Sequence, residues 1–400
     1  MQGSSQRKVT IVGAGVAGLE ALLALRKLAP GAAQVELIAD SPQFVYSPLA
    51  VAEPFGLGTA HKFELTRIAR EQGARLHVTG VARLEPGERR IITWDGRALG
   101  YDILLFAIGA RAVNAIPGTI TVKGPAYTSR FRTLLRELDR HRTHRIAFAV
   151  PVGSSWPLPL YELALMTAAH IAERGLRKTT LQLVTHESEP LELFGPKASA
   201  AVRELLDERG VELITSRAPV EAHKGELITA PGGALAADRV VSLPRLVGPS
   251  VQGLPGDGDG FIPVDLHARV EGLEHVYAAG DATTNPIKQG GVAAQQADAA
   301  AEAIAAELGV IEAPHPFRPV LRGLLLTGGT PRYFRSEVAG GRGDDLEVSE
   351  SALWWPPGKI AGRHLAPYLA AHIDEGDKPL EGIGVEVQLD GGAAAVAPSR

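Results

Sequence analysis

Apolar positions along the chain fall into two kinds of segment, and the two kinds alternate. Residues 8–12 and 35–39 are short runs rich in valine, isoleucine and leucine, as expected of buried strands. Between them, leucines recur with helical spacing from residue 19 to residue 25, which predicts a helix that ends near Ala29. A strand, a helix and a second strand in this order predict a βαβ unit of a parallel sheet.

The same order returns in the middle of the chain, where strands are expected at 145–150 and 180–185 and a helix at 161–174. Two further apolar strands are expected at 101–106 and 275–279. An alanine-rich helix is expected from residue 292 to about residue 308. The two βαβ units make an approximate internal repeat of one α/β architecture, typical of nucleotide-binding domains.

A glycine fingerprint lies between the strand and the helix of the first βαβ unit. Gly13, Gly15 and Gly18 stand in the pattern GxGxxG, and Asp40 follows the second strand, 22 residues after Gly18. Gly13 permits a tight turn, Gly15 lets the backbone approach a pyrophosphate, and Gly18 allows close packing of helix on strand. The N–H groups that begin the helix attract phosphates, and Asp40 can accept hydrogen bonds from both ribose hydroxyls. The combination predicts a dinucleotide site for FAD or NAD and argues against a 2′-phosphate.

A second group of residues, far along the chain, favours FAD. Gly280 and Asp281 follow the expected strand at 275–279, and Gly290 comes just before the alanine-rich helix. A carboxylate at a strand end can bind the hydroxyl groups of a ribitol chain. The start of the following helix can face the N1/C2=O edge of a flavin and stabilise the charge of its reduced form. Lys288 is a further candidate for this edge, or else a solvated loop lysine.

Small residues follow the expected strand at 101–106, with Ala107 and Gly109 in the sequence AIGA. They would allow the chain to cross closely over a bound dinucleotide, although any buried strand can end in this way. Ala107 and Gly109 complete the set of residues that we expect to bind the cofactor.

Composition excludes several kinds of chemistry. None of the 400 residues is cysteine, so the chain has no disulfide, no thiolate nucleophile and no cysteine-ligated iron–sulfur cluster. The 12 histidines show no zinc-binding pattern, and we expect no metal site. A formal net charge of -4 does not indicate nucleic-acid binding. Because no apolar run reaches the roughly 18 residues of a membrane span, we expect a cytoplasmic protein that touches the inner face of the membrane at most peripherally.

Three sequences, in this order along the chain, resemble the FAD-binding half of the pyridine nucleotide–disulfide oxidoreductase superfamily: GAGVAG near the N-terminus, the central YDILLFAIGA and the later VYAAGDA. The central sequence has Ile108 where the family has threonine. A softer match at 44–56 looks like type II NADH dehydrogenases and sulfide:quinone oxidoreductases. Two others, at 190–213 and 316–329, look more like the branch of sulfide:quinone oxidoreductases and flavocytochrome sulfide dehydrogenases.

The resemblance implies an α/β fold with two interleaved, three-layer Rossmann-like domains. The expected units are a discontinuous FAD-binding domain at 1–112 and 251–310, a second domain of the NAD(P)H-binding type at 113–250, and a C-terminal α+β subdomain at 311–400. Within the last unit we expect a strand at 324–326, an exposed loop at 339–350 and a helix over 360–373 with a kink at Pro367.

The second βαβ unit departs from the family because its turn is not a glycine fingerprint. Residues 151–159 read PVGSSWPLP, and Trp156 and the prolines cannot give the close backbone approach of three glycines. Either NAD(P)H binds in a modified way, with Glu187 on the ribose, or the domain has lost the nucleotide, as in the sulfide branch of the family. Glu162 either caps free N–H groups of the helix or corresponds to an acidic residue of type II NADH dehydrogenases.

The electron acceptor also stays open at this point. Gln295 matches a glutamine that lies near the quinone in type II NADH dehydrogenases, but Gly290-Gly291 stands where their Ala-Gln pair is expected. Trp354 and Trp355 have three interpretations: a cover over flavin or quinone, an anchor at a membrane surface, or packing between the C-terminal subdomain and the FAD-binding domain.

The lack of cysteine excludes the paired-cysteine electron transfer of sulfide:quinone oxidoreductases and disulfide reductases. We therefore predict an FAD-dependent oxidoreductase that passes electrons from NAD(P)H to a quinone or another small-molecule acceptor, with Lys288, Gln295 and Glu162 as candidate catalytic residues. The alternatives are a flavoprotein of the sulfide-dehydrogenase lineage with a different donor, and a non-catalytic FAD-binding redox sensor. The sequence is compatible with an oligomer and does not fix its state.

Overall fold

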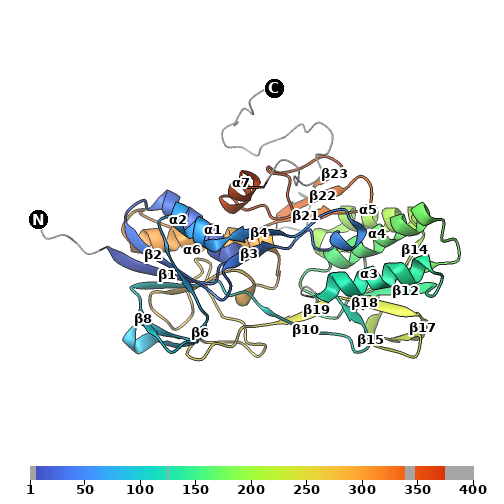
Figure 1. Cartoon of the computed structure of the whole chain (residues 1–400), viewed down its shortest axis with the longest axis horizontal. Coiled ribbons are helices and arrows are strands. Elements are labelled where there is room, and N and C mark those ends of the chain that lie inside the picture. The colour runs from blue at the N-terminus through green and yellow to red at the C-terminus, as the bar shows by residue number, and fades with distance from the viewer. Residues whose placement is uncertain (1–5, 124–125, 338–346, 374–400) are drawn as a thin grey trace, which may run out of the picture.

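The computed structural model describes residues 6–123, 126–337 and 347–373, and the statements below concern these residues. Two parallel β-sheets stand side by side, at the left and right of Figure 1, and the C-terminal strands lie above both of them. The elements expected from the sequence in both sheets are present, with ends within three residues of the prediction. The predicted α/β fold with two Rossmann-like domains is confirmed.

The first sheet is built from strands near both ends of the chain. Its order is β20-β9-β1-β2-β5, with the bounds Val276–Ala278, Ile103–Phe106, Arg7–Val12, Ala33–Ala39 and Arg75–Val78, and all pairs are parallel. Alternate side chains, such as Ile11 and Leu37, pack on helices α1 (Val16–Leu28) and α6 (Gly290–Glu307). The opposite set, such as Leu104, packs on a small antiparallel sheet of β6 (Val81–Glu85), β7 (Arg90–Thr93) and β8 (Ala98–Gly100). Three layers result.

The second sheet repeats this plan with residues from the middle of the chain. Its order is β11-β18-β12-β13-β14, with the bounds Ile120–Thr121, Arg239–Ser242, Arg145–Ala149, Thr180–Val184 and Val211–Ile214. One face packs on helices α3 (Ala126–Asp139), α4 (Leu158–Arg174) and α5 (Pro196–Glu208). The other face packs on an antiparallel sheet of β15 (Ala218–His223), β16 (Glu226–Ala230) and β17 (Gly233–Ala236). The sequence repeat is therefore a structural repeat.

Short antiparallel elements connect these layers. The chain leaves the first sheet through β10 and returns through β19, which pair with each other (Arg111–Asn114 with Pro244–Val247). A further pair, β3 (Gln43–Tyr46) and β4 (His61–Glu64), precedes α2 (Leu65–Glu71). Short 3-10 helices occupy Glu53–Phe55, Pro86–Glu88, Glu192–Phe194 and Gly280–Ala282.

None of the helices among the described residues is long and apolar enough to cross a membrane.

The C-terminal part differs from its prediction in three places. The expected strand at 324–326 is the end of the longer β21 (Val320–Leu325), which pairs with β22 (Arg332–Glu337). The expected loop at 339–350 ends in β23 (Glu347–Ser349), while its residues up to 346 lie outside the described residues. The expected helix over 360–373 is only α7 (Leu365–Ala370), and Pro367 lies in its first turn, where a missing N–H donor is tolerated without a kink.

A buried carboxylate fixes the start of α7 to the first domain. Glu20 of α1 accepts hydrogen bonds from the backbone N–H groups of His364 and Leu365, at 2.6 and 2.7 Å. Asp298 of α6 lies beside it, and one of its oxygens has no hydrogen-bond partner. Burial, together with the charge of Glu20 and despite Arg363, raises the pKa of Asp298 to about 8. Burial also raises the pKa of Glu20, so the two carboxyl groups titrate as a coupled pair.

Asp298→Asn should make the stability of the protein less sensitive to alkaline pH. The pKa of Asp298 is higher in the folded state than its ordinary value, so the protonated carboxyl stabilises the fold at low pH and this contribution is lost as pH rises through about 8. Between pH 6 and pH 9 the loss is about 2.7 kcal/mol in the wild type, or about 3 °C in Tm for a chain of 400 residues. Thermal unfolding of both proteins at the two pH values measures it, and parallel pH dependences would contradict it.

Candidate functional site

The strands of the first sheet open at their carboxyl ends onto one cavity of about 810 Å³. This volume lies within the usual range for sites of small molecules and cofactors. Segments that follow all five strands line the cavity: residues 13–17 after β1, 40–41 after β2, 79–82 after β5, 107–111 after β9 and 279–281 after β20. Open α/β sheets bind their ligands at this edge.

The three fingerprint glycines have different surroundings. A Cβ atom at Gly13, whose φ is +103°, would lie 2.2 Å from the Ala107 carbonyl oxygen, and one at Gly18 would lie 1.9 Å from the Gly13 carbonyl oxygen. The protein itself therefore requires glycine at these two positions. Gly15 differs, because a Cβ there would meet no protein atom within 4 Å, and it would enter the cavity that Gly15 lines. The space beside Gly15, at the start of α1, is free for a ligand's phosphates.

Most of the residues expected to bind the cofactor come together at this cavity. Of the nine, only Gly18 does not line it, because it packs beneath the turn against Gly13. The lining members are Gly13, Gly15, Asp40, Ala107, Gly109, Gly280, Asp281 and Gly290. Asp40, after β2, and Gly280, after β20, lie toward opposite ends of the sheet edge. Five strands spaced about 4.8 Å apart make this edge about 19 Å long, which suits an extended dinucleotide.

Asp281 lines the cavity and interacts electrostatically with Lys288, which is buried and does not line it. Burial raises the pKa of Asp281, and the charge of Lys288 counteracts this shift. Burial lowers the pKa of Lys288 to about 8. The Lys288 ammonium donates a hydrogen bond to the Thr283 carbonyl oxygen and lies 3.8 Å from the centre of the Phe261 ring. Lys288 does not line the cavity, and its charge acts on Asp281. A direct contact of Lys288 with the flavin stays a prediction, and the position of Lys288 does not favour it.

Three glutamines near the start of α6 have separate tasks. Gln296, which the sequence did not single out, accepts hydrogen bonds from the Gly280 N–H and the Thr283 hydroxyl and so holds the turn that contains Asp281. Gln289 caps α6 by accepting a hydrogen bond from the Val292 N–H, at 2.8 Å. Gln295, the candidate quinone residue, exchanges two hydrogen bonds with the backbone of Val320 and thereby joins α6 to β21. Its amide faces β21 rather than the cavity.

Glu162 lies in a buried ion pair between the second domain and the C-terminal subdomain. Its carboxylate is completely buried on α4 and accepts hydrogen bonds from Lys359, at 2.5 and 2.6 Å, and from the Leu326 N–H, at 2.9 Å. Burial raises the pKa of Glu162, and Lys359 opposes that shift. The expected capping of its own helix is wrong, because both oxygens are engaged by the C-terminal subdomain and the first turn of α4 contains no acidic residue.

The turn of the second domain offers few groups for a nucleotide. Pro157 stands at the N-cap of α4, Pro159 has no N–H, and the Leu160 N–H donates to the Pro157 carbonyl. Glu187, the candidate ribose ligand after β13, is buried and accepts hydrogen bonds from the Tyr161 and Thr185 hydroxyls, at 2.8 and 2.9 Å. Both hydrogen bonds go to Oε2, so this oxygen of the carboxylate is engaged within the domain.

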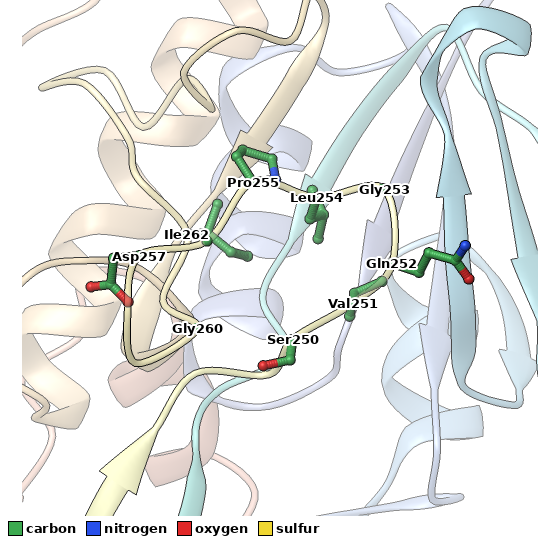
Figure 2. A pocket seen from close by; sticks show the side chains of 10 residues that line it. Ser250, Val251, Gln252, Gly253, Leu254, Pro255, Asp257, Gly260 and Ile262 are labelled. Atoms are coloured by element: carbon green, nitrogen blue, oxygen red, sulfur yellow. The ribbon is translucent and has the colours of Figure 1, made fainter.

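A smaller hollow of about 360 Å³ adjoins the main cavity, inside the loop that returns the chain to the first domain. Ser250 and Val251 line both spaces, and Figure 2 shows the loop from Ser250 to Ile262 curving around the hollow with the Gln252 side chain directed away from it. Backbone and apolar atoms form most of its wall, so it offers little specific chemistry.

The two adjacent tryptophans have different surroundings. Trp354 is buried, its indole N–H donates to the Gly358 carbonyl at 2.8 Å, and it makes an edge contact with Tyr333. Trp354 therefore packs within the C-terminal subdomain, and packing against the FAD-binding domain stays a prediction. Trp355 is exposed, and neither tryptophan lines the cavity.

Comparison with known proteins decides the family. The model of a family described as pyridine nucleotide-disulphide oxidoreductase matches residues 7–297. The chain belongs to this family. Members of the family bind FAD and use NAD(P)H, and the cavity fits such a cofactor: Gly15 opens onto it and Asp40 and Asp281 line it toward its two ends.

The individual relatives of this chain are distant in sequence. Putidaredoxin reductase CamA of Pseudomonas putida is 28% identical over 215 residues, which are 52% of this chain and about half, 48%, of that protein. The sulfide:quinone oxidoreductase of Aquifex aeolicus has a similar structure, with a TM-score of 0.79, 20% identity and 86% of each chain covered. The ferredoxin reductase for the CYP199A2 system of Rhodopseudomonas palustris has a TM-score of 0.64, 19% identity and coverage of 84% of this chain and 83% of that one. At these identities the structural likeness shows the fold alone.

Proposed function

We propose that this member of the family is an FAD-dependent oxidoreductase that passes electrons from NAD(P)H to a quinone or another small-molecule acceptor without cysteine chemistry. The observation that carries the proposal is the cavity at the carboxyl edge of the first sheet, where three distant segments bring glycines and two carboxylates together. When bound there, FAD supplies the electron-carrying chemistry that a chain without cysteine cannot obtain from thiols.

The chain's own residues bind and orient the cofactor in this proposal. The N–H groups at the start of α1 face the pyrophosphate beside Gly15, and Asp40 accepts hydrogen bonds from the ribose. Asp281 binds the ribitol hydroxyls, while Gln296 and Lys288 hold its turn in place. Gly290 lines the cavity at the start of α6, where the helix dipole favours negative charge. Hydride transfer needs no acid or base, so none is assigned.

The structure of the second domain favours a second candidate function, in which the electron donor is not NAD(P)H. The prolines at the start of α4 and the hydrogen bond from Tyr161 to Glu187 leave few groups for a dinucleotide. In that case the protein receives electrons from a donor other than NAD(P)H, as a flavoprotein of the sulfide-dehydrogenase lineage or as a redox sensor. The proposal has two further parts, peripheral contact with a membrane and assembly into an oligomer. Both of these parts depend on which electron acceptor the protein uses.

Anaerobic stopped-flow spectroscopy tests the donor. The proposal predicts that NADH or NADPH rapidly bleaches the visible absorbance of the bound flavin, and that a soluble quinone restores it much faster than oxygen does. Bleaching by dithionite but by neither nucleotide would rule out NAD(P)H as the donor and favour the second candidate. Reoxidation by quinone no faster than by oxygen would argue against a quinone acceptor.

A further inference from the structure

Trp94 is an exposed tryptophan at the rim of the main cavity. It follows β7, it is 67% exposed, and it is one of the residues that line the cavity. The other aromatic residue of the lining, Phe44, is buried and stacks on Phe63, with ring centres 6.1 Å apart. Trp94 is therefore the aromatic lining residue that has a large apolar surface left to bury.

The backbone holds the Trp94 indole in a defined place. Its backbone N–H donates to the Gly80 carbonyl oxygen at 2.9 Å. The ring lies on Gly80 so closely that a Cβ atom there would be 2.4 Å from two indole carbons. The neighbouring Thr79 N–H donates to the Ala39 carbonyl oxygen, at 2.8 Å, and so ties this turn to the end of β2, next to Asp40.

The order of the strands tells which end of a dinucleotide reaches Trp94. Thr79 and Gly80 follow β5, which is at one edge of the sheet, and Gly280 follows β20, at the other edge. Asp40, the proposed ribose ligand, follows β2, the neighbour of β5. If Asp281 and α6 bind the flavin half at the β20 edge, the adenine lies beyond Asp40 and reaches the turn of Thr79 and Gly80 against which the indole is held.

We infer that the Trp94 indole stacks on the adenine ring of bound FAD and thereby contributes to affinity for the whole dinucleotide. The inference rests on the proposed FAD site and adds the residue that recognises its adenine. Stacking requires only a flat aromatic face, which Trp94 presents at the rim, and every purine has a suitable π-surface. Adenine nucleotides that lack the flavin should therefore also contact Trp94.

Two measurements on the apo-protein test the inference, and Trp355 serves as the matched control because its exposed fraction, 68%, is nearly equal. We expect ADP to quench the tryptophan fluorescence of the wild type and of the Trp355→Phe variant, but not that of Trp94→Phe. We expect Trp94→Ala to raise the Kd for FAD by about 5- to 150-fold, and Trp94→Phe to raise it less, because phenylalanine keeps a smaller aromatic face.

The results separate this inference from the proposed function. Wild-type binding of FAD together with an unchanged Kd in Trp94→Ala would overturn the role of Trp94 and leave the FAD site standing. Quenching by ADP that persists in Trp94→Phe would also overturn it. A wild-type protein that binds neither FAD nor ADP would instead contradict the FAD site itself. Equal Tm values of the apo-proteins show that the variants are folded, which the exposure of Trp94 leads us to expect.

Discussion

Gly15→Val is expected to fold like the wild type and to lose FAD. The backbone of Gly15 has a φ of -80°, which any residue adopts, and a Cβ there would meet no protein atom within 4 Å. The valine side chain would instead occupy the space that the pyrophosphate needs beside the start of α1. We expect affinity for FAD to fall more than about 100-fold, measured by titration of the apo-protein, while its Tm stays unchanged.

Gly18→Ala is the matched control from the same fingerprint. The added methyl group would lie 1.9 Å from the Gly13 carbonyl oxygen, so helix and turn must move apart. We expect a loss of about 1–3 kcal/mol in the unfolding free energy of the apo-protein. One variant then loses the ligand and the other loses stability. Wild-type affinity for FAD in Gly15→Val would show that the phosphates lie elsewhere.

Lys359→Met should be strongly destabilising. It leaves the Glu162 carboxylate, which is 0% exposed, without its counter-charge, and breaking a buried pair from one side typically costs about 3–5 kcal/mol. Without Lys359 the pKa of Glu162, already raised by burial, rises further. A raised pKa means that the protonated acid stabilises the fold and that this contribution is lost as pH rises. Denaturant unfolding should therefore show a larger defect at pH 8 than at pH 5.

The double variant Glu162→Gln/Lys359→Met separates the ion pair from other effects. Because it leaves no unpaired charge, we expect it to be more stable than either single variant. Simple additivity of the two single losses would contradict the ion pair. If the double variant regains stability but transfers electrons to quinone more slowly than the wild type, Glu162 has a role in the reaction beyond joining α4 to the C-terminal subdomain.

Local patterns were sufficient to predict both sheets and most of the cavity. The alternation of apolar runs and helical spacing placed the strands and helices, since each element buries its own side chains against the next layer. The glycine fingerprint predicted the turn at 13–18 because its glycines serve contacts within that turn and with Ala107. Asp40 and Asp281 line the cavity because parallel strands end at the same edge of the sheet.

Partners far away in sequence could not be predicted in this way. Glu162 pairs with Lys359, 197 residues later, and Gln295 joins Val320, 25 residues later, so neither side chain has a local signal for its partner. The helix expected over 360–373 begins only at Leu365. Before it, Lys359 bonds to Glu162, and the backbone N–H of His364 donates to Glu20, so distant partners hold this segment. Trp94 reaches the cavity only because β7 lies beside the turn that contains Gly80.

The flavin content of the gently purified protein tests the central claim most directly. We predict a yellow protein that releases FAD, a single molecule per chain, when it is denatured. The identity of the released compound is checked by chromatography against FAD and FMN. A colourless protein that takes up no FAD when the cofactor is added, or one that holds FMN in its place, would contradict the assignment of the cavity to FAD.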